Sequence, residues 1–163
     1  MSATLRWLAL GAAVTLLDQA TKQLVSRMLA AGEAVTVAPF FDLVHVRNPG
    51  AAFSFLSDAP GWQRELFIAI ALAAIVWIVY LLHKHARETL FCLALALILG
   101  GAAGNLIDRV AFGAVIDFLD FHLGGHHWPA FNAADSAITC GAALLIWDSL
   151  RRPAADRDRA GTA

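Results

Sequence analysis

Two long apolar runs without charged residues constrain this chain more than any other feature of its sequence. They are Leu66–Leu82 (LFIAIALAAIVWIVYLL) and Thr89–Ile107 (TLFCLALALILGGAAGNLI). About 20 mostly apolar residues in a helix cross the hydrocarbon core of a bilayer. The chain has 163 residues, of which 59% are hydrophobic and 15% charged, and a soluble domain of this size cannot bury so much apolar surface. The sequence therefore predicts an integral membrane protein.

Two further segments are predicted to span the membrane once a few polar residues are accepted within them. Ser136–Trp147 is apolar and lengthens toward Trp128 if Asp135 lies at its start. The N-terminal apolar run Trp7–Leu17 reaches spanning length only if Asp18 and Lys22 are included, and these two lie one helical turn apart and can pair. A cleaved signal peptide is the less favoured interpretation of this segment, since no clean small-residue cleavage site follows it. The predicted spans are residues 5–28, 64–82, 89–107 and 133–150.

The distribution of Lys and Arg predicts the orientation of the chain. Arg6, the loop HKHAR (residues 83–87) and the tail beginning at Arg151 are basic and fall on one side of a four-span protein. Basic loops stay in the cytoplasm, so both termini are expected to be cytoplasmic. The expected fold class is a membrane all-α protein with four transmembrane helices and a small extracytoplasmic β element. Residues 1–152 form the single predicted domain, and residues 153–163 are expected to be a disordered cytoplasmic tail.

The outer loop over residues 33–60 carries the signals of a β element. Val44 and Val46 alternate with polar neighbours, as in a strand with one buried face. The sequence Asn48-Pro49-Gly50 then favours a turn, after which residues 51–56 are predicted to return as a second strand. We expect a small sheet on the membrane surface.

Several functional classes are disfavoured by the composition. A formal net charge of -1 gives no basic excess, so no nucleic-acid partner is expected. Cys92 and Cys140 form neither a disulfide framework nor a metal pattern. His122 and His126 are spaced as in a helical metal site, but Gly124-Gly125 between them argues against that helix, and the HExxH glutamate is absent. Neither a metal nor an organic cofactor is expected.

The ionisable residues at membrane depth are the candidates for chemistry, because burying a charge there is costly. They are Asp18, Lys22, Asp108, Arg109, Asp117, Asp120 and Asp135. Two carboxyls in one pocket share a proton, which gives a general base and a general acid near neutral pH.

Each candidate also has a structural interpretation. Asp108 is predicted to pair with its neighbour Arg109 and Asp18 with Lys22, while Asp135 is equally well explained as a charge at a helix N-terminus. The spacing does not choose between Asp117 and Asp120. The amides of Asn105 and Asn132 are too costly to leave unpaired; their structural and substrate-binding roles are equally favoured.

Five fragments, taken together, resemble one known family. They are DQATKQLV from Asp18, RNPGAAFSFL from Arg47, GGAAGNLIDR from Gly100, VIDF from Val115 and WPAFNAADSAI from Trp128. The chain is similar over nearly the whole range from Asp18 to Trp147 to the signal peptidase II family, the lipoprotein signal peptidases. The fragments occur in the order of that family and between the expected spans.

This resemblance implies an aspartyl endopeptidase of the bacterial cytoplasmic (inner) membrane, with its active site toward the extracytoplasmic face. Such enzymes cleave the signal peptide from diacylglyceryl-modified prolipoproteins on the N-terminal side of the lipidated cysteine. By motif match the catalytic pair is Asp117 and Asp135, and Asp120 has no catalytic role. The residues expected around the substrate and the pair are Asn48, Gly50, Asn105, Arg109, Asn132 and Ala133.

The resemblance also implies supporting residues and partners. Asp18 and Lys22, with Asp108, are expected to be structural or supporting. Membrane lipids, prolipoproteins and inhibitors of the globomycin type are the expected partners of a monomeric enzyme. The alternative function is a small membrane transporter or proton relay, which also uses intramembrane acids. It is disfavoured because no inverted repeat is visible and the acids gather on one side.

Overall fold

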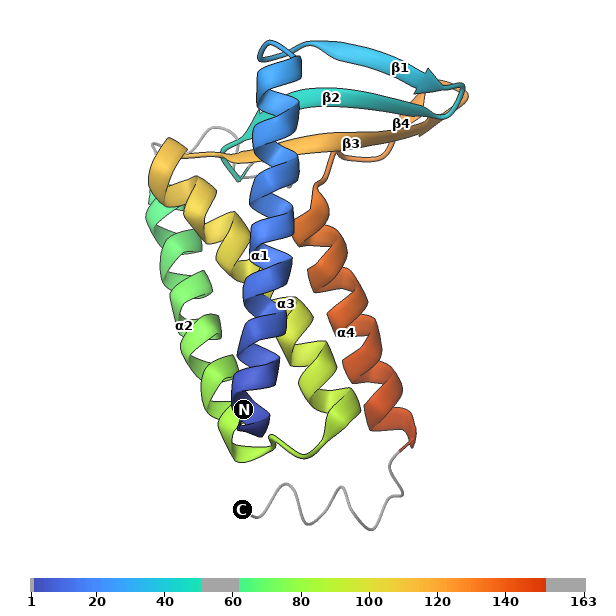
Figure 1. Cartoon of the computed structure of the whole chain (residues 1–163). Coiled ribbons are helices and arrows are strands. Elements are labelled where there is room, and N and C mark those ends of the chain that lie inside the picture. Colours follow the sequence, from blue (N-terminus) through green and yellow to red (C-terminus); the bar gives the residue numbers. More distant parts are fainter. Residues whose placement is uncertain (1, 51–61, 152–163) are drawn as a thin grey trace.

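The computed structural model describes residues 2–50 and 62–151, which form a helical bundle with a small sheet at one end (Figure 1). The helices are α1 (Ala3–Met28), α2 (Trp62–Lys84), α3 (Thr89–Phe112) and α4 (Ala133–Arg151). The first residues of α1 and the end of α4 lie at the end of the bundle opposite the sheet. The predicted combination of a mostly helical protein with a small β element is confirmed.

Two helices among the described residues are long and apolar enough to cross a membrane, α2 with a mean hydropathy of 2.6 and α3 with 2.2. Only 11% of the most apolar 18-residue stretch of α2 is buried inside the protein, and side chains such as Ile70 and Val76 are exposed. An apolar helix without protein cover needs an apolar surrounding. Helices α1 and α4 contain charged residues and are not among the described helices that qualify by length and apolar composition. Their crossing of a membrane stays a prediction.

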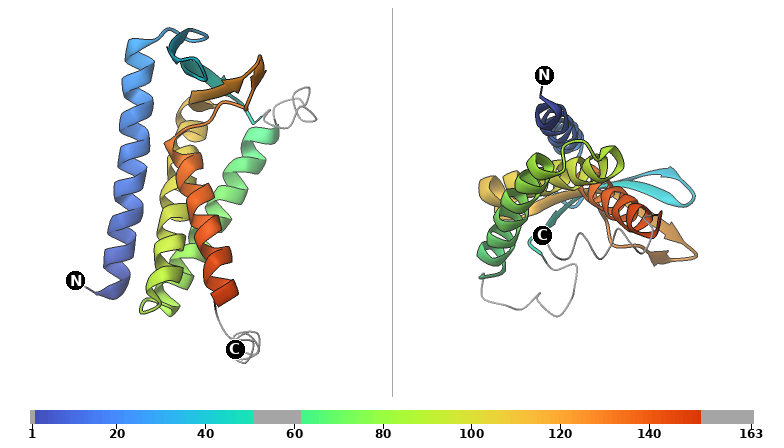
Figure 2. Two further views of the ribbon diagram at one scale, coloured as in Figure 1. Left: turned by 90° about the vertical axis from the view of Figure 1, so that its right-hand side faces the viewer. Right: turned by 90° about the horizontal axis from the view of Figure 1, so that it is seen from below.

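Helix α3 packs against each of the other three helices, as the two views of Figure 2 help to show. Its glycines allow this. A Cβ on Gly100 would lie 2.6 Å from the carbonyl oxygen of Gly11 in α1, and one on Gly101 would collide with the carbonyl of Ala134 in α4. Small residues at such positions let helix backbones approach closely. The helix ends where Gly113 adopts φ 75°, a left-handed conformation that suits a C-terminal glycine.

The sheet joins two segments that are distant in the sequence. It is antiparallel, in the order β1 (Ala34–Ala38), β2 (Phe41–Asn48), β3 (Val115–Leu123) and β4 (His126–His127). The first two strands fall within the predicted outer β element, whereas the return strand predicted for residues 51–56 lies outside the described residues. The sequence pattern predicts no strand over residues 115–123. In the sequence, β3 is separated from its partner β2 by α2 and α3. A local sequence pattern therefore could not reveal the pairing.

His122, His126 and His127 lie in the strands of the β3–β4 hairpin, not on a helix. Gly124 and Gly125 form its turn with φ values of 58° and 82°, and His122 pairs with His127 across it. Within the part of the chain that the structure describes, no group of three or more His, Cys, Asp or Glu side chains could hold a metal ion.

Candidate active site

A cavity of about 410 Å³ lies at the sheet end of the bundle and brings together Asp117 of β3 and Asp135 of α4. Segments from five parts of the chain line it. Its wall consists of Asn48, Gly50, Phe67, Asn105, Arg109, Val115, Asp117, Trp128, Pro129, Ala130, Phe131 and Asp135. Two carboxyls therefore line the same cavity.

Asp135 is fixed by the way in which α4 begins. The backbone N–H of Asp135 donates to Oδ1 of Asn132 (3.0 Å), and the backbone N–H of Asn132 donates to Oδ2 of Asp135 (3.3 Å). This reciprocal pair is the arrangement of a capping box, which satisfies backbone donors that a helix N-terminus leaves free. The sequence Asn132-Ala-Ala-Asp135 thus starts the helix and holds the carboxylate at the same time.

Asp117 is almost completely buried, with 2% of its surface exposed. Its Oδ1 accepts a hydrogen bond from Nδ2 of Asn132 (2.7 Å) and its Oδ2 from Nδ2 of Asn48 (3.0 Å). Burial raises the pKa of Asp117 to about 6, and the negative charge of Asp135 acts in the same direction, while the two amide donors oppose the shift. Asp117 therefore retains its proton to a higher pH than an ordinary aspartate.

Asn105 connects Asp135 to a buried lysine. Its Nδ2 donates to Oδ1 of Asp135 (2.8 Å), and its Oδ1 accepts from Nζ of Lys22 (2.9 Å). An ammonium group only donates hydrogen bonds, so Lys22 fixes which end of the amide faces it and which faces Asp135. The orientation of Asn105 follows from this chemistry.

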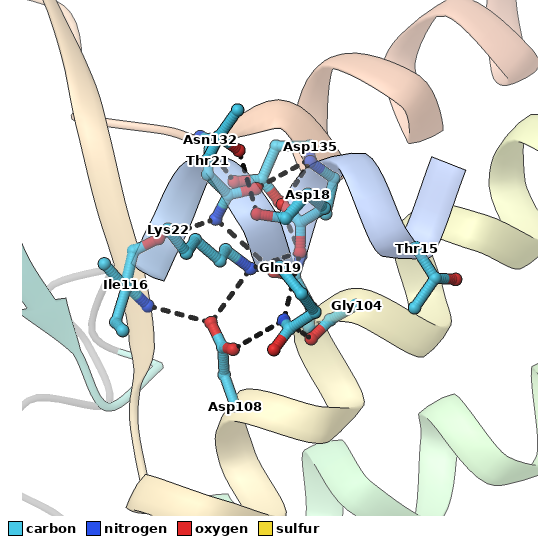
Figure 3. Close-up of polar contacts among 12 residues, drawn as sticks. Thr15, Asp18, Gln19, Thr21, Lys22, Gly104, Asp108, Ile116, Asn132 and Asp135 are labelled. Atoms are coloured by element: carbon cyan, nitrogen blue, oxygen red, sulfur yellow. Dashed lines mark hydrogen bonds and ion pairs between the residues drawn. The ribbon is translucent and has the colours of Figure 1, made fainter. Parts of the chain in front are cut away.

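Lys22 is the centre of a buried ion-pair network (Figure 3). Its Nζ lies 2.8 Å from Oδ2 of Asp18 and 2.9 Å from Oδ2 of Asp108, and the side chains are buried. A buried charge is tolerated when it is paired and fully hydrogen-bonded. Asp18 accepts from the backbone N–H of Ala134 (2.8 Å) and Asp108 from that of Ile116 (3.1 Å). The network thus ties α1 and α3 to the segments that carry the two candidate carboxyls.

The predicted Asp18–Lys22 pair is confirmed, but the predicted pairing of Asp108 with Arg109 is wrong. Asp108 pairs with Lys22 of α1 instead. Consecutive residues of a helix point in different directions, so adjacency in the sequence opposes the contact. Arg109 instead lies with its guanidinium carbon 5.0 Å from the ring centre of Phe67, and its Nε has no hydrogen-bond partner among the described residues.

The remaining candidates differ in their distance from the cavity. Gly50 lines it with φ 112°, and a Cβ there would lie 2.5 Å from the ring of Phe67. Asn132 is fully buried behind the wall, where it holds both aspartates. Ala133 is not part of the lining and packs against the cluster of Val25, Leu29 and Phe118. Asp120, three positions after Asp117, lies outside the lining and pairs with His127 (2.9 Å).

Sequence reasoning missed Gln19 and Phe67. Nε2 of Gln19 donates to Oδ1 of Asp108 (2.9 Å) and to the carbonyl of Gly104 (3.1 Å). Its signal was available, because Gln19 is a polar residue within the first apolar segment and within the fragment DQATKQLV. Phe67 gave no signal, since it lies in a uniformly apolar run.

A helical bundle with lipid-compatible helices and two carboxyls in one cavity has the features of a membrane-embedded hydrolase of the aspartyl type. The comparisons with known proteins make the class specific. The family model described as signal peptidase (SPase) II matches residues 10–151. The chain belongs to the signal peptidase II family, a family of proteases, and the resemblance in its sequence is thereby confirmed.

The similar proteins match nearly the full chain. A lipoprotein signal peptidase of Janthinobacterium sp. (strain Marseille) is 58% identical over 151 residues, which cover 93% of this chain and 92% of that protein. One of Paraburkholderia phymatum is 60% identical over 146 residues, covering 90% and 88%. A solved structure described as a bacterial membrane enzyme at 1.9 Å resolution has a TM-score of 0.79 and 33% identity, and covers 91% of this chain and 94% of that one.

Proposed function

We propose that this chain is a membrane aspartyl endopeptidase that removes signal peptides from diacylglyceryl-modified prolipoproteins, cleaving on the N-terminal side of the lipidated cysteine. The observation that carries the proposal is the meeting of Asp117 and Asp135 in one cavity, each held by side-chain amides. The relatives named lipoprotein signal peptidases support the class of substrate. The alternative, a transporter or proton relay, has less support because the candidate carboxyls gather at one end of the bundle.

In the proposed mechanism Asp135 is the general base and Asp117 the general acid. A helix N-terminus favours negative charge, which suits Asp135 as the carboxylate. Asp117 keeps its proton up to about pH 6, because burial raises its pKa to about that value. Asp135 takes a proton from water as its oxygen attacks the scissile carbonyl, and Asp117 donates its proton to the carbonyl oxygen. The resulting neutral diol collapses as the leaving nitrogen receives a proton from Asp135 and Asp117 recovers its own.

The residues around the pair have proposed supporting roles. Arg109 lines the cavity and its guanidinium is a proposed donor to a substrate carbonyl, while Asn48 at the end of β2 and the following Gly50 border the same cavity. Asn105 and Asn132 position the two carboxyls, and Ala133 packs the start of α4. Asp18, Lys22 and Asp108 are structural. The reaction needs neither a metal nor a cofactor, and cyclic peptides of the globomycin type would occupy the same cavity.

We further propose that all four helices cross the bacterial inner membrane, with residues 1–152 as one domain and both termini in the cytoplasm. The tryptophans support this arrangement, because this residue prefers the two membrane interfaces. Trp7 lies near the start of α1 and Trp147 near the end of α4, at the end of the bundle opposite the sheet, whereas Trp62 begins α2 and Trp128 follows β4 at the sheet end. Arg6, Arg87 and Arg151 lie at the end opposite the sheet. Because basic residues prefer the cytoplasm, this end is the inner one.

This orientation explains how a lipid-anchored substrate reaches the cavity. The cavity then lies near the outer interface, where the scissile bond of an inserted signal helix emerges. The diacylglyceryl chains stay in the bilayer, beside the exposed apolar faces of the helices. The enzyme is proposed to act as a monomer, because all the candidate residues come from one chain.

The test compares purified wild type with the variants Asp117→Asn and Asp135→Asn on a diacylglyceryl-modified prolipoprotein. Each variant is expected to lose about 10³-fold or more in kcat/KM, while EDTA has no effect on the wild type. Asp120→Asn is the matched control, since Asp120 lies on the same strand but outside the cavity, and it should stay active. Cleavage that survives either of the first two substitutions would overturn the catalytic assignment.

A further inference from the structure

A second cavity, of about 420 Å³, lies at the end of the bundle opposite the candidate active site. The first turns of α1 and the connection between α2 and α3 form it, and these segments meet at that end in Figure 1. Arg6, Trp7 and Leu10 line it from α1, and Arg87 and Thr89 from the connection and the start of α3. None of these residues belongs to the lining of the catalytic cavity.

A specific hydrogen bond between α1 and the α2–α3 connection holds the wall of this cavity. Nε1 of Trp7 donates a hydrogen bond to the carbonyl oxygen of Ala86 (3.1 Å), which ties α1 to the connection 79 residues later. That bond uses the only donor of the indole and fixes the ring as part of the wall. Trp7 and Leu10 therefore present a stable apolar surface, with the two guanidinium groups beside it.

Arg6 and Arg87 give the cavity two exposed guanidinium groups within the part of the chain that the structure describes. Neither Arg6 nor Arg87 forms an ion pair there. The nearest acid along the chain, Glu88, is bound to Nδ1 of His85. Two unpaired guanidiniums and the hydroxyl of Thr89 form a set of donors that suits a phosphate diester, since arginine matches phosphate geometry with two parallel bonds.

We propose that this cavity binds the headgroup of an anionic phospholipid of the cytoplasmic leaflet, of the phosphatidylglycerol type. The apolar side formed by Trp7 and Leu10 suits the glycerol and the first methylene groups of an acyl chain, which an inorganic anion lacks. Basic pockets between membrane helices on the cytoplasmic side are suited to such headgroups. The inference goes beyond the peptidase activity and relies on the proposed orientation alone.

The experiment measures lipid binding to the full chain in detergent by native mass spectrometry, with phosphatidylglycerol and phosphatidylcholine as probes. Wild type is expected to retain one tightly bound phosphatidylglycerol and no phosphatidylcholine. The double variant Arg6→Gln/Arg87→Gln should bind it roughly thirty-fold more weakly, from about fivefold for each basic group near the membrane surface. Each single variant should lose about fivefold.

The matched control is Lys84→Gln/Arg151→Gln, which removes two charges from the same end of the bundle but outside the cavity. It should keep the wild-type affinity. An equal loss in both double variants would mean general attraction to a basic surface and would overturn the proposal. Displacement of the lipid by millimolar inorganic phosphate would overturn it in favour of a soluble anion. An unchanged melting temperature of each variant in detergent, and unchanged cleavage of a prolipoprotein in the same detergent, distinguish failure here from failure of the proposed function.

Discussion

Asp117 and Asp135 are the same residue type in different surroundings, and this difference determines what each can do. Asp117 lies on a buried strand, and burial raises its pKa to about 6. Asp135 lies in the first turn of α4, where its carboxylate takes part in the helix cap. Asn132 contacts both, so the pair is held as a unit.

The first prediction concerns the pH dependence of cleavage. A general acid with a raised pKa is competent below that pKa and is lost as the pH rises through it. The alkaline limb of kcat/KM, which reports the free enzyme, is therefore expected near pH 6 in wild type. Asn48→Ala removes a donor that stabilises the ionised form of Asp117, so the limb should move to higher pH, by roughly half a unit to one unit.

The prediction concerns the pH at which the limb lies and not the size of kcat/KM. The value of kcat/KM is also expected to fall when Asn48 is lost from the cavity. Thr36→Ala, on the neighbouring strand β1, is a control that should leave the limb in place. A limb that moves to lower pH in Asn48→Ala would contradict the assignment of Asp117 as the acid.

The second prediction concerns the stability of Asp117→Asn. Because the pKa of Asp117 is higher in the folded protein than its ordinary value of 3.8, its contribution to stability is fully present below that value and is lost as the pH rises through about 6. The neutral amide has no such pH-dependent cost, although its NH2 group must face one of the two amide donors, Asn48 or Asn132, that Asp117 accepts from. We expect the stability of the variant relative to wild type to rise by about 3 kcal/mol between pH 4 and pH 8. Thermal unfolding in detergent at the two pH values measures it, and an equal difference at both would contradict it.

At the scale of the elements, α3 organises the molecule because its glycines admit neighbours on two sides. Gly100 faces the backbone of α1 and Gly101 that of α4. The latter contact is with the carbonyl of Ala134, the residue directly before Asp135. The close packing of α3 against α4 and the position of Asp135 therefore both depend on the absence of a side chain at Gly101.

The third prediction is that Gly101→Ala lowers both stability and activity. Its methyl group would collide with the backbone of α4, and such overpacking costs about 1–3 kcal/mol. The shift of the first turn of α4 should also reduce kcat by displacing Asp135. Val110→Ile adds carbon at an exposed position of the same helix and should change neither quantity. Activity and melting temperature both equal to wild type in Gly101→Ala would show that α4 does not depend on this contact.

The sequence predicted the helices better than the strands, for a physical reason. The apolar runs of α2 and α3 are local properties of consecutive residues, and so is the turn at Asn48-Pro49-Gly50. Strand β3 depends on pairing with β2, and the two residues Asn48 and Asp117 that meet across them are 69 positions apart. Likewise, the Asp18–Lys22 pair follows from helical spacing, whereas the partner of Asp108 comes from another helix and could not be read from the chain.

At the scale of the whole molecule, polar and apolar surfaces divide along the bundle axis. The cavity with Asp117 and Asp135 lies at the sheet end, and the cavity with Arg6 and Arg87 lies at the other. Between them, α2 exposes apolar side chains over most of its length. This is the distribution that a bilayer of about 30 Å hydrocarbon thickness would cover.

The fourth prediction tests the proposed orientation by cysteine labelling in intact spheroplasts. In a Cys140→Ala background, Leu123→Cys at the exposed tip of β3 should react with a membrane-impermeant maleimide added outside. Lys84→Cys, at the end of α2, should react only after the membrane is permeabilised. Labelling of both sites from outside, or the reverse order, would contradict the orientation with both termini in the cytoplasm.

The double role of Asn132 has a consequence for how this protein could adapt to temperature. One side chain starts α4 and also holds Asp117, so a substitution that loosens or tightens the start of α4 also changes how firmly Asp117 is held. A lineage moving to a warmer habitat would have to gain rigidity elsewhere, in the lipid-facing surfaces or the outer strands. A cold-adapted relative would meet the same restriction, because loosening the start of α4 would also loosen the hold on Asp117.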